Sequence, residues 1–186
     1  MEIPSNQSPI VHIGGSGVII NNKYNLNYIC PKHKVNYDMV RIGILLYGYG
    51  DKGHIKKLRR VMKIESKIIN ILDVKNGQYI GYGQNYKAKN NMKVAIVPVG
   101  YGDGLLREFS KEGYLKVITI NEGKKYIFKC AIVGNICMDA TMINVTNVEN
   151  LKLYDKVIIM DNADKMARKL KTIPYEILTN FNKLRT

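Results

Sequence analysis

The stretch YLKVITINEGKKYIFKCAIVG, from Tyr114 to Gly134, decides the fold class of this chain. Its two halves, Tyr114–Ile120 and Lys125–Gly134, are rich in the β-branched and aromatic residues that favour strands. The NEGK between them contains a glycine and suits a tight turn. The stretch therefore predicts two antiparallel strands joined in a hairpin.

Further short strands, each followed by a turn, are predicted on both sides of this hairpin. The runs that predict them are apolar or alternate between apolar and polar residues: VRIGILLYG (Val40–Gly48), KIESKIINILDV (Lys63–Val74), VAIVPVG (Val94–Gly100), ATMINVTNV (Ala140–Val148) and DKVIIMD (Asp155–Asp161). Pro98 inside one run predicts an edge strand or a bulge there, because proline cannot donate to a ladder. This succession favours an antiparallel β-barrel or sandwich over βαβ units.

The spacing of apolar residues changes near the C-terminus. NADKMARKLKTIPYEILTNFNKL, from Asn162 to Leu184, places its apolar side chains at helical spacing. Pro174 suits the first turn of a helix, so we predict two short helices, or one helix broken before Pro174. The predicted fold class is therefore mainly β: an antiparallel barrel or sandwich-like domain with short C-terminal helices.

The composition narrows the possible functions. The chain has 186 residues, 46% of them hydrophobic, and a net charge of +14. This is enough for one ordinary domain, and we expect neither a transmembrane helix nor a signal peptide. Three cysteines do not suggest a disulfide framework, so we expect a cytoplasmic protein. Because the lysines are scattered and tryptophan is absent, we do not expect nucleic-acid binding as the main function.

Three other motifs give only weak signals of a functional site. GYGDKG, Gly48–Gly53, has the G-x-G-x-x-G spacing of a dinucleotide-binding loop, and Asp73 follows at a suitable distance, but hairpins come next instead of strand–helix units. Cys30 and His33 have no second ligand pair, so no metal site is predicted. Cys137 could be a nucleophile, although a buried thiol is the simpler interpretation.

Two tyrosines between glycines form a stronger candidate site. The tripeptide Gly-Tyr-Gly occurs at Tyr82 and again at Tyr101, at either end of a predicted strand. Tyrosine is usually structural, and it is a poor base unless positive charge or donated hydrogen bonds lower its pKa from about 10. Glycine on both sides allows close backbone approach and unusual angles. The flanking glycines therefore favour a tyrosine that is placed at a functional site.

Five motifs together resemble the C-terminal part of bacterial alanine racemases. They follow in the same order over about residues 37–180: YDMVRIGILLYGYG, IGYGQNYKA, VPVGYGDGLLR, VGNICMDATMINVT and TIPYEIL. The resemblance implies a mostly β domain that follows an N-terminal α/β barrel. It also implies a homodimer that uses pyridoxal 5′-phosphate (PLP) to interconvert L- and D-alanine. Serine racemases share this domain, so serine remains an alternative substrate.

The resemblance also implies roles for residues that face the substrate. Tyr82 would be the catalytic base on one face of the substrate, and Tyr101 would narrow the entrance of the active site. Met138 would present its backbone N–H to the substrate carboxylate, with Asp139 beside it. In the family these groups act on the cofactor of the other subunit. The family usually has alanine where Gly102 stands here.

A second set of residues would hold the subunit's own cofactor. Arg41 would face the pyridine nitrogen, and since arginine does not readily give up a proton, that nitrogen would stay unprotonated. The backbone of Gly43 and Ile44 and the hydroxyl of Tyr175 would hold the phosphate. Upstream, HIGGSG resembles the last barrel segment of the family more faintly, which makes His12 and Ser16 weaker candidates.

The family's other base, a lysine that binds PLP covalently, has no counterpart in this chain. We therefore expect residues 1–38 to be a remnant of the barrel's end and residues 39–186 to be the C-terminal β domain. Racemisation needs a proton donor and an acceptor on opposite faces of the substrate, so the isolated chain should be inactive. The alternative is a catalytically silent basic β-domain that acts as a binding or structural module.

Overall fold

The computed structural model describes residues 10, 12, 14–17, 38–50 and 58–181. Contacts divide the chain into two compact units, Met1–Val61 and Met62–Thr186. The expected boundary between the barrel remnant (residues 1–38) and the β domain (residues 39–186) stays a prediction. No helix among the described residues is long and apolar enough to cross a membrane.

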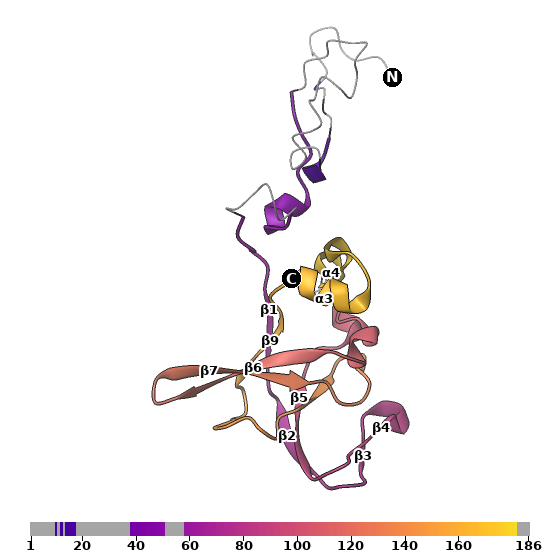
Figure 1. Ribbon diagram of the computed structural model, residues 1–186, viewed down its shortest axis with the longest axis vertical. Helices are drawn as coiled ribbons and strands as arrows, with labels where there is room; N and C mark the ends of the chain where they lie inside the picture. The colour runs from indigo at the N-terminus through magenta and orange to yellow at the C-terminus, as the bar shows by residue number, and fades with distance from the viewer. Residues whose placement is uncertain (1–9, 11, 13, 18–37, 51–57, 182–186) are drawn as a thin grey trace. The chain divides into compact units, whose positions relative to one another are not determined.

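The second unit is built from antiparallel strands (Figure 1). One sheet has the order β1 (Ile64–Lys67), β9 (Lys156–Met160), β6 (Tyr114–Asn121), β7 (Lys124–Ala131). The other has the order β2 (Asn70–Val74), β5 (Met92–Val97), β8 (Thr141–Asn144), and β3 (Tyr79–Ile80) pairs with β4 (Tyr86–Lys87). A single bridge, Ile132 to Ile143, links the two larger sheets. The predicted mainly β, sandwich-like fold is confirmed, and the dinucleotide-binding alternative is wrong.

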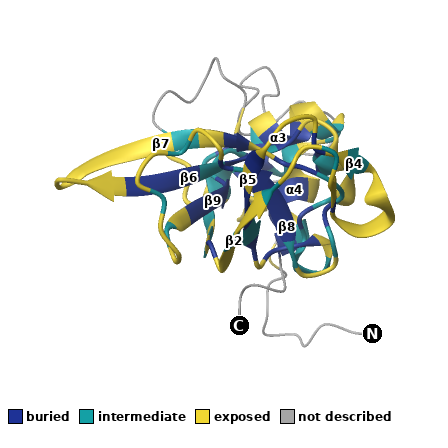
Figure 2. Cartoon of the chain, turned by 90° about the horizontal axis from the view of Figure 1, so that it is seen from below, coloured by how far each residue is buried: buried dark blue, intermediate teal, exposed yellow. Residues whose placement is uncertain are grey.

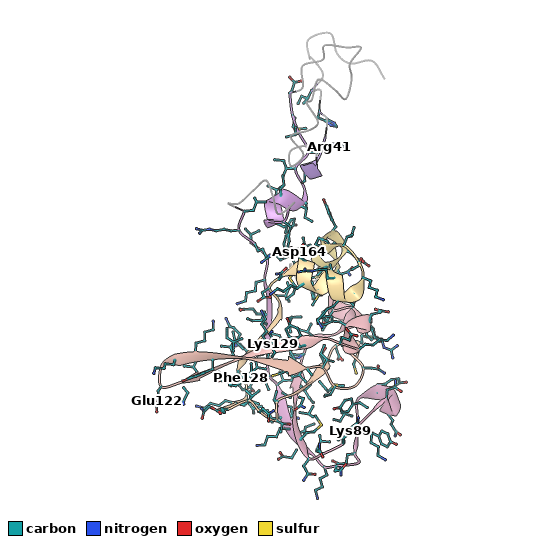
Figure 3. All side chains as sticks on the ribbon, viewed as in Figure 1. Arg41, Lys89, Glu122, Phe128, Lys129 and Asp164 are labelled. Carbon is teal, nitrogen blue, oxygen red and sulfur yellow. The ribbon has the colours of Figure 1, made fainter. Side chains whose placement is uncertain are left out.

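The hairpin of β6 and β7 is as the sequence predicts. The two strands pair over their whole length, from Tyr114 opposite Ala131 to Asn121 opposite Lys124. Glu122 and Gly123 close the turn with positive φ angles of 50° and 74°, as the favoured two-residue hairpin turns require. The hairpin extends away from the rest of the sheet, with Glu122 at its tip (Figures 1 and 3).

Two short helices end the described chain, as predicted. In α3 (Ala163–Leu170), the side chain of Asn162 caps the first turn by accepting a hydrogen bond from the Lys165 N–H, at 3.2 Å. The helix stops at Lys171, which adopts the left-handed conformation with φ 54°. Pro174 then opens α4 (Pro174–Asn180), where its missing N–H costs nothing.

Two local expectations are wrong. Val40–Gly48 is not a strand, because Ile44–Tyr47 form a 3₁₀ turn, η1, that ends at the left-handed Gly48. The run does not alternate between buried and exposed residues, since only Ile44 within the turn is buried. Pro98 does not mark an edge, because β5 ends at Val97 and is the central strand of its sheet. The proline lies beyond the ladder, where no N–H is needed.

A small core lies at one end of the second unit. It consists of buried side chains from β3, β5, β8 and the loops beside them: Ile80, Ala88, Met92, Val94, Val133 and Met142. Figure 2 shows buried residues along β5, β6, β8 and β9, and exposed ones along most of β7. Since Ile80 is buried two residues before Tyr82, this core anchors the loop that carries the tyrosine.

Candidate active site

A hollow of about 410 Å³ opens in the second unit where several loops meet. We call it the Tyr82 hollow, and its lining residues are Tyr82, Tyr101, Arg107, Asn135, Ile136, Cys137, Met138 and Asp139. The structure thus brings together all four residues that the sequence assigns to the substrate side. They come from three segments that are far apart in the sequence.

Tyr82 stands at the start of a three-residue 3₁₀ turn, η2 (Tyr82–Gln84), directly after β3. Gly81 and Gly83 on either side both have φ 79°, a conformation that strains other residues. Tyr82 is 81% exposed. The loop thus leaves Tyr82 accessible to a molecule in the hollow.

Tyr101 begins another 3₁₀ turn, η3 (Tyr101–Asp103), which is joined to the Met138 loop. The Tyr101 N–H donates to the Cys137 carbonyl at 2.9 Å, and the Gly102 N–H donates to the Met138 carbonyl at 2.8 Å. Among the described residues, the N–H of Met138 itself makes no hydrogen bond. This unpaired donor belongs to a residue that lines the hollow, and an unpaired backbone N–H can bind an anionic group.

Sequence reasoning missed two polar residues of the hollow, Arg107 and Asn135. Arg107 begins η4 (Arg107–Ser110), and Ser110 holds this turn to the loop by accepting from the Ile136 N–H at 2.9 Å. Asn135 donates from Nδ2 to the Tyr82 carbonyl at 3.3 Å. Both placements depend on contacts between distant segments. The only local signal was the position of each residue inside a motif already quoted.

The two described cysteines differ in their surroundings. Cys137 is half-buried and lines the hollow, so the expectation of a buried thiol there is wrong. It lies where the loop turns toward solvent, with its N–H bound to the Ala140 carbonyl at 2.9 Å. Cys130 is buried on β7, and burial raises the pKa of its thiol to about 11.

The described residues hold no group of three or more His, Cys, Asp or Glu that could bind a metal ion. Cys30 and His33, the pair considered in the sequence, lie outside the described residues.

Three of the residues predicted to hold the cofactor lie together in the first unit. The buried Ser16 accepts hydrogen bonds at Oγ from the N–H groups of Gly43, at 3.0 Å, and Leu45, at 3.4 Å. Ile44 lies between these two N–H donors in the chain. Both N–H groups therefore already donate to Ser16 Oγ. The assignment of Ser16, Gly43 and Ile44 to the phosphate of PLP stays a prediction.

The remaining cofactor candidates are placed as follows. Arg41 follows the bridge that joins His12 to Met39, and its N–H donates to the Gly14 carbonyl at 3.1 Å. Its side chain is exposed. Tyr175 belongs to the second unit, where it lies on α4 with 50% of its surface exposed. Each of these assignments stays a prediction.

The family profile described as "Alanine racemase, C-terminal domain" matches residues 61–185. This chain belongs to the alanine racemase family. The resemblance seen in the sequence is confirmed, because alanine racemase 1 of Caldanaerobacter subterraneus subsp. tengcongensis is 35% identical over 185 residues, which cover 94% of this chain. The alanine racemase of Borreliella burgdorferi is 36% identical over 180 residues.

Solved alanine racemases share the fold as well. The Clostridium difficile enzyme in complex with cycloserine has a TM-score of 0.70 at 33% identity, covering 91% of this chain. The Bartonella henselae enzyme with covalently bound pyridoxal phosphate has a TM-score of 0.72 at 27% identity, covering 94%. The chain spans less than half of each relative, 43% of the Caldanaerobacter protein and 45% of the Bartonella one.

Proposed function

We propose that this chain is the C-terminal part of a PLP-dependent amino-acid racemase that interconverts L- and D-alanine in the cytoplasm. In the complete homodimer, the Tyr82 hollow of one subunit would face the cofactor of the other. The N-terminal barrel would supply the lysine that binds PLP. The chain alone would then be inactive, because it holds one of the two bases that racemisation needs.

The observation that carries this proposal is the presentation of Tyr82. Tyr82 is 81% exposed between two left-handed glycines, at a hollow that also contains Tyr101 and Met138. Such exposure is costly for a merely structural aromatic residue, whose area would be better buried. Tyr82 would remove or return the proton at the substrate Cα.

The other residues would bind and orient the substrate and the cofactor. The free N–H of Met138 would donate to the substrate carboxylate, and Tyr101 would restrict the entrance. Ser16, Gly43 and Ile44 would hold the cofactor phosphate together with the Tyr175 hydroxyl, and Arg41 would face the ring nitrogen. When bound, PLP supplies the electron sink that makes the Cα–H acidic enough to transfer.

The test is a chimera in which the N-terminal part of the Caldanaerobacter relative is joined to this chain. With PLP present, we expect the chimera to racemise L-alanine and the chain alone to be silent. Tyr82→Phe should lower kcat at least a hundredfold, as loss of a general base does. Tyr79→Phe is the matched control, because Tyr79 is another exposed tyrosine that lies outside the hollow.

Each outcome separates the alternatives. Activity in the chain alone would overturn the proposal, because a lysine of this chain would then have to bind PLP. A stronger rate with L-serine than with L-alanine would keep the mechanism and change the substrate. A folded chimera that is silent with both amino acids would favour the binding or structural module.

A further inference from the structure

Within residues 58–181, the phenol of Tyr82 is held through its own backbone. This residue is 81% exposed, and among the described residues its hydroxyl makes no hydrogen bond. Glycines precede and follow it, and glycine leaves the chain more conformational freedom than any other residue. The direction of the ring therefore depends on whatever fixes the peptide groups around Tyr82.

Asn135 holds one of these peptide groups from another loop. Its Nδ2 donates to the Tyr82 carbonyl at 3.3 Å, although the two residues are 53 positions apart. The contact exists because the backbones approach closely: a Cβ on Gly81 would lie 3.6 Å from the Asn135 nitrogen and 3.7 Å from the Gly134 Cα. The amide thus bridges two loops where their backbones lie close together.

The loop that carries Asn135 is itself fixed to its neighbours. The Ile136 N–H donates to Ser110 Oγ, and the Cys137 N–H donates to the Ala140 carbonyl, each at 2.9 Å. The Cys137 carbonyl in turn accepts from the Tyr101 N–H at 2.9 Å. Asn135 therefore joins a loop with several restraints to a glycine-flanked loop with few.

We propose that Asn135 is a positioning residue that holds Tyr82 in the correct place relative to the Met138 N–H. This inference rests on the proposed function. Asn135 lies three residues before Met138, so one loop carries both the substrate donor and the support of the base. Misplacing a catalytic group by about 1 Å costs rate more than binding. Removing the amide should lower kcat about tenfold and change KM less than twofold.

The first experiment measures the chain itself, without any activity. The ¹⁵N heteronuclear NOE of the Tyr82 and Gly83 amides should fall in Asn135→Ala and in Asn135→Asp. The aspartate keeps the shape of asparagine but cannot donate to a carbonyl. Asn90→Asp is the control for charge, because Asn90 is exposed and lies outside the hollow. It should leave both NOEs unchanged.

The second experiment measures kcat and KM of the same variants in the chimera. Both Asn135 variants should lose kcat while KM is kept, and Asn90→Asp should match the unsubstituted chimera. Unchanged NOEs in the Asn135 variants would overturn the inference, and so would lower NOEs with an unchanged kcat. If the unsubstituted chimera is inactive, the proposed function fails, and the NOEs alone then decide whether Asn135 holds Tyr82.

Discussion

The backbone of Gly81 lies against the backbone of Gly134, and this contact closes the Tyr82 loop onto the Met138 loop. A Cβ on Gly134 would lie 3.6 Å from the Gly81 Cα and 2.8 Å from the Ile80 carbonyl oxygen. Both glycines have positive φ angles, 79° and 73°. The positive φ angles favour glycine at both positions. At Gly134, a side chain would also clash with the Ile80 carbonyl oxygen.

Gly134→Ala should lower the free energy of unfolding by about 3 kcal/mol, because left-handed strain adds to a clash with backbone. Gly77→Ala is the control: Gly77 also has positive φ, 87°, but a Cβ there would meet nothing within 4 Å. Gly77→Ala should lower the free energy of unfolding by about 1 kcal/mol, from backbone strain alone. Urea unfolding of both variants measures the difference. Equal losses would show that the close approach is unimportant.

Replacing either of two buried threonines on the sheets with valine should change the free energy of unfolding differently. Thr141 donates from Oγ1 to the Val99 carbonyl at 2.6 Å, so Thr141→Val should cost about 1–3 kcal/mol by leaving that carbonyl unpaired. Thr119 Oγ1 is buried and has no hydrogen-bond partner among the described residues, so Thr119→Val should be neutral or stabilise by up to about 1 kcal/mol. Thermal unfolding compares the two. A large loss in Thr119→Val would contradict the assignment.

Cys130 should make stability depend on pH in the alkaline range. Burial raises the pKa of its thiol from 9.0 to about 11. Above pH 9 the unfolded chain therefore loses this proton before the folded one does, and stability falls as pH rises toward 11. The slope from this group is at most about 1.4 kcal/mol per pH unit.

Cys130→Ala isolates the contribution of that thiol from other groups that titrate in the same range. Urea unfolding between pH 8 and 10.5 should show the variant less stable at pH 8, with the gap to the parent narrowing as pH rises. A gap that stays constant across the range would show that the Cys130 thiol ionises equally in both states.

Gly102→Ala should displace the Met138 loop. A Cβ at Gly102 would lie 2.9 Å from the Met138 carbonyl oxygen and 3.2 Å from its Cγ, so one of them must move. The 2.8 Å hydrogen bond from the Gly102 N–H should lengthen. In ¹H–¹⁵N spectra we expect the largest shift changes at Met138 and Asp139. Changes confined to Gly102 itself would mean that the loop accepts alanine without moving.

The sequence predicts the elements whose causes are local. The hairpin follows from a glycine turn between two β-rich runs, and α4 follows from Pro174 at its first turn. The prediction from sequence fails at Val40–Gly48, where apolar residues and glycines favour a strand but the chain makes a 3₁₀ turn. It fails also at Pro98, because the end of β5 depends on how far its neighbours extend.

The site was less predictable than the fold. Tyr82, Tyr101, Met138 and Asp139 came from the resemblance to the racemases, and the structure gathers them in one hollow. Arg107 and Asn135 were missed because their positions depend on hydrogen bonds between segments 26 and 53 residues apart. No periodicity or local motif encodes such contacts.

Among the described strands, none pairs with the outer edge of β7, and this edge affects how the protein behaves at high concentration. β7 is the last strand of its sheet and carries exposed Lys124 and Lys125 beside Tyr126 and Ile127. Two copies that met edge to edge would bring like charges together, which opposes the strand pairing that begins fibrils. The lysines of the hairpin thus protect solubility, and replacing them with threonine should promote aggregation of a chain that still folds.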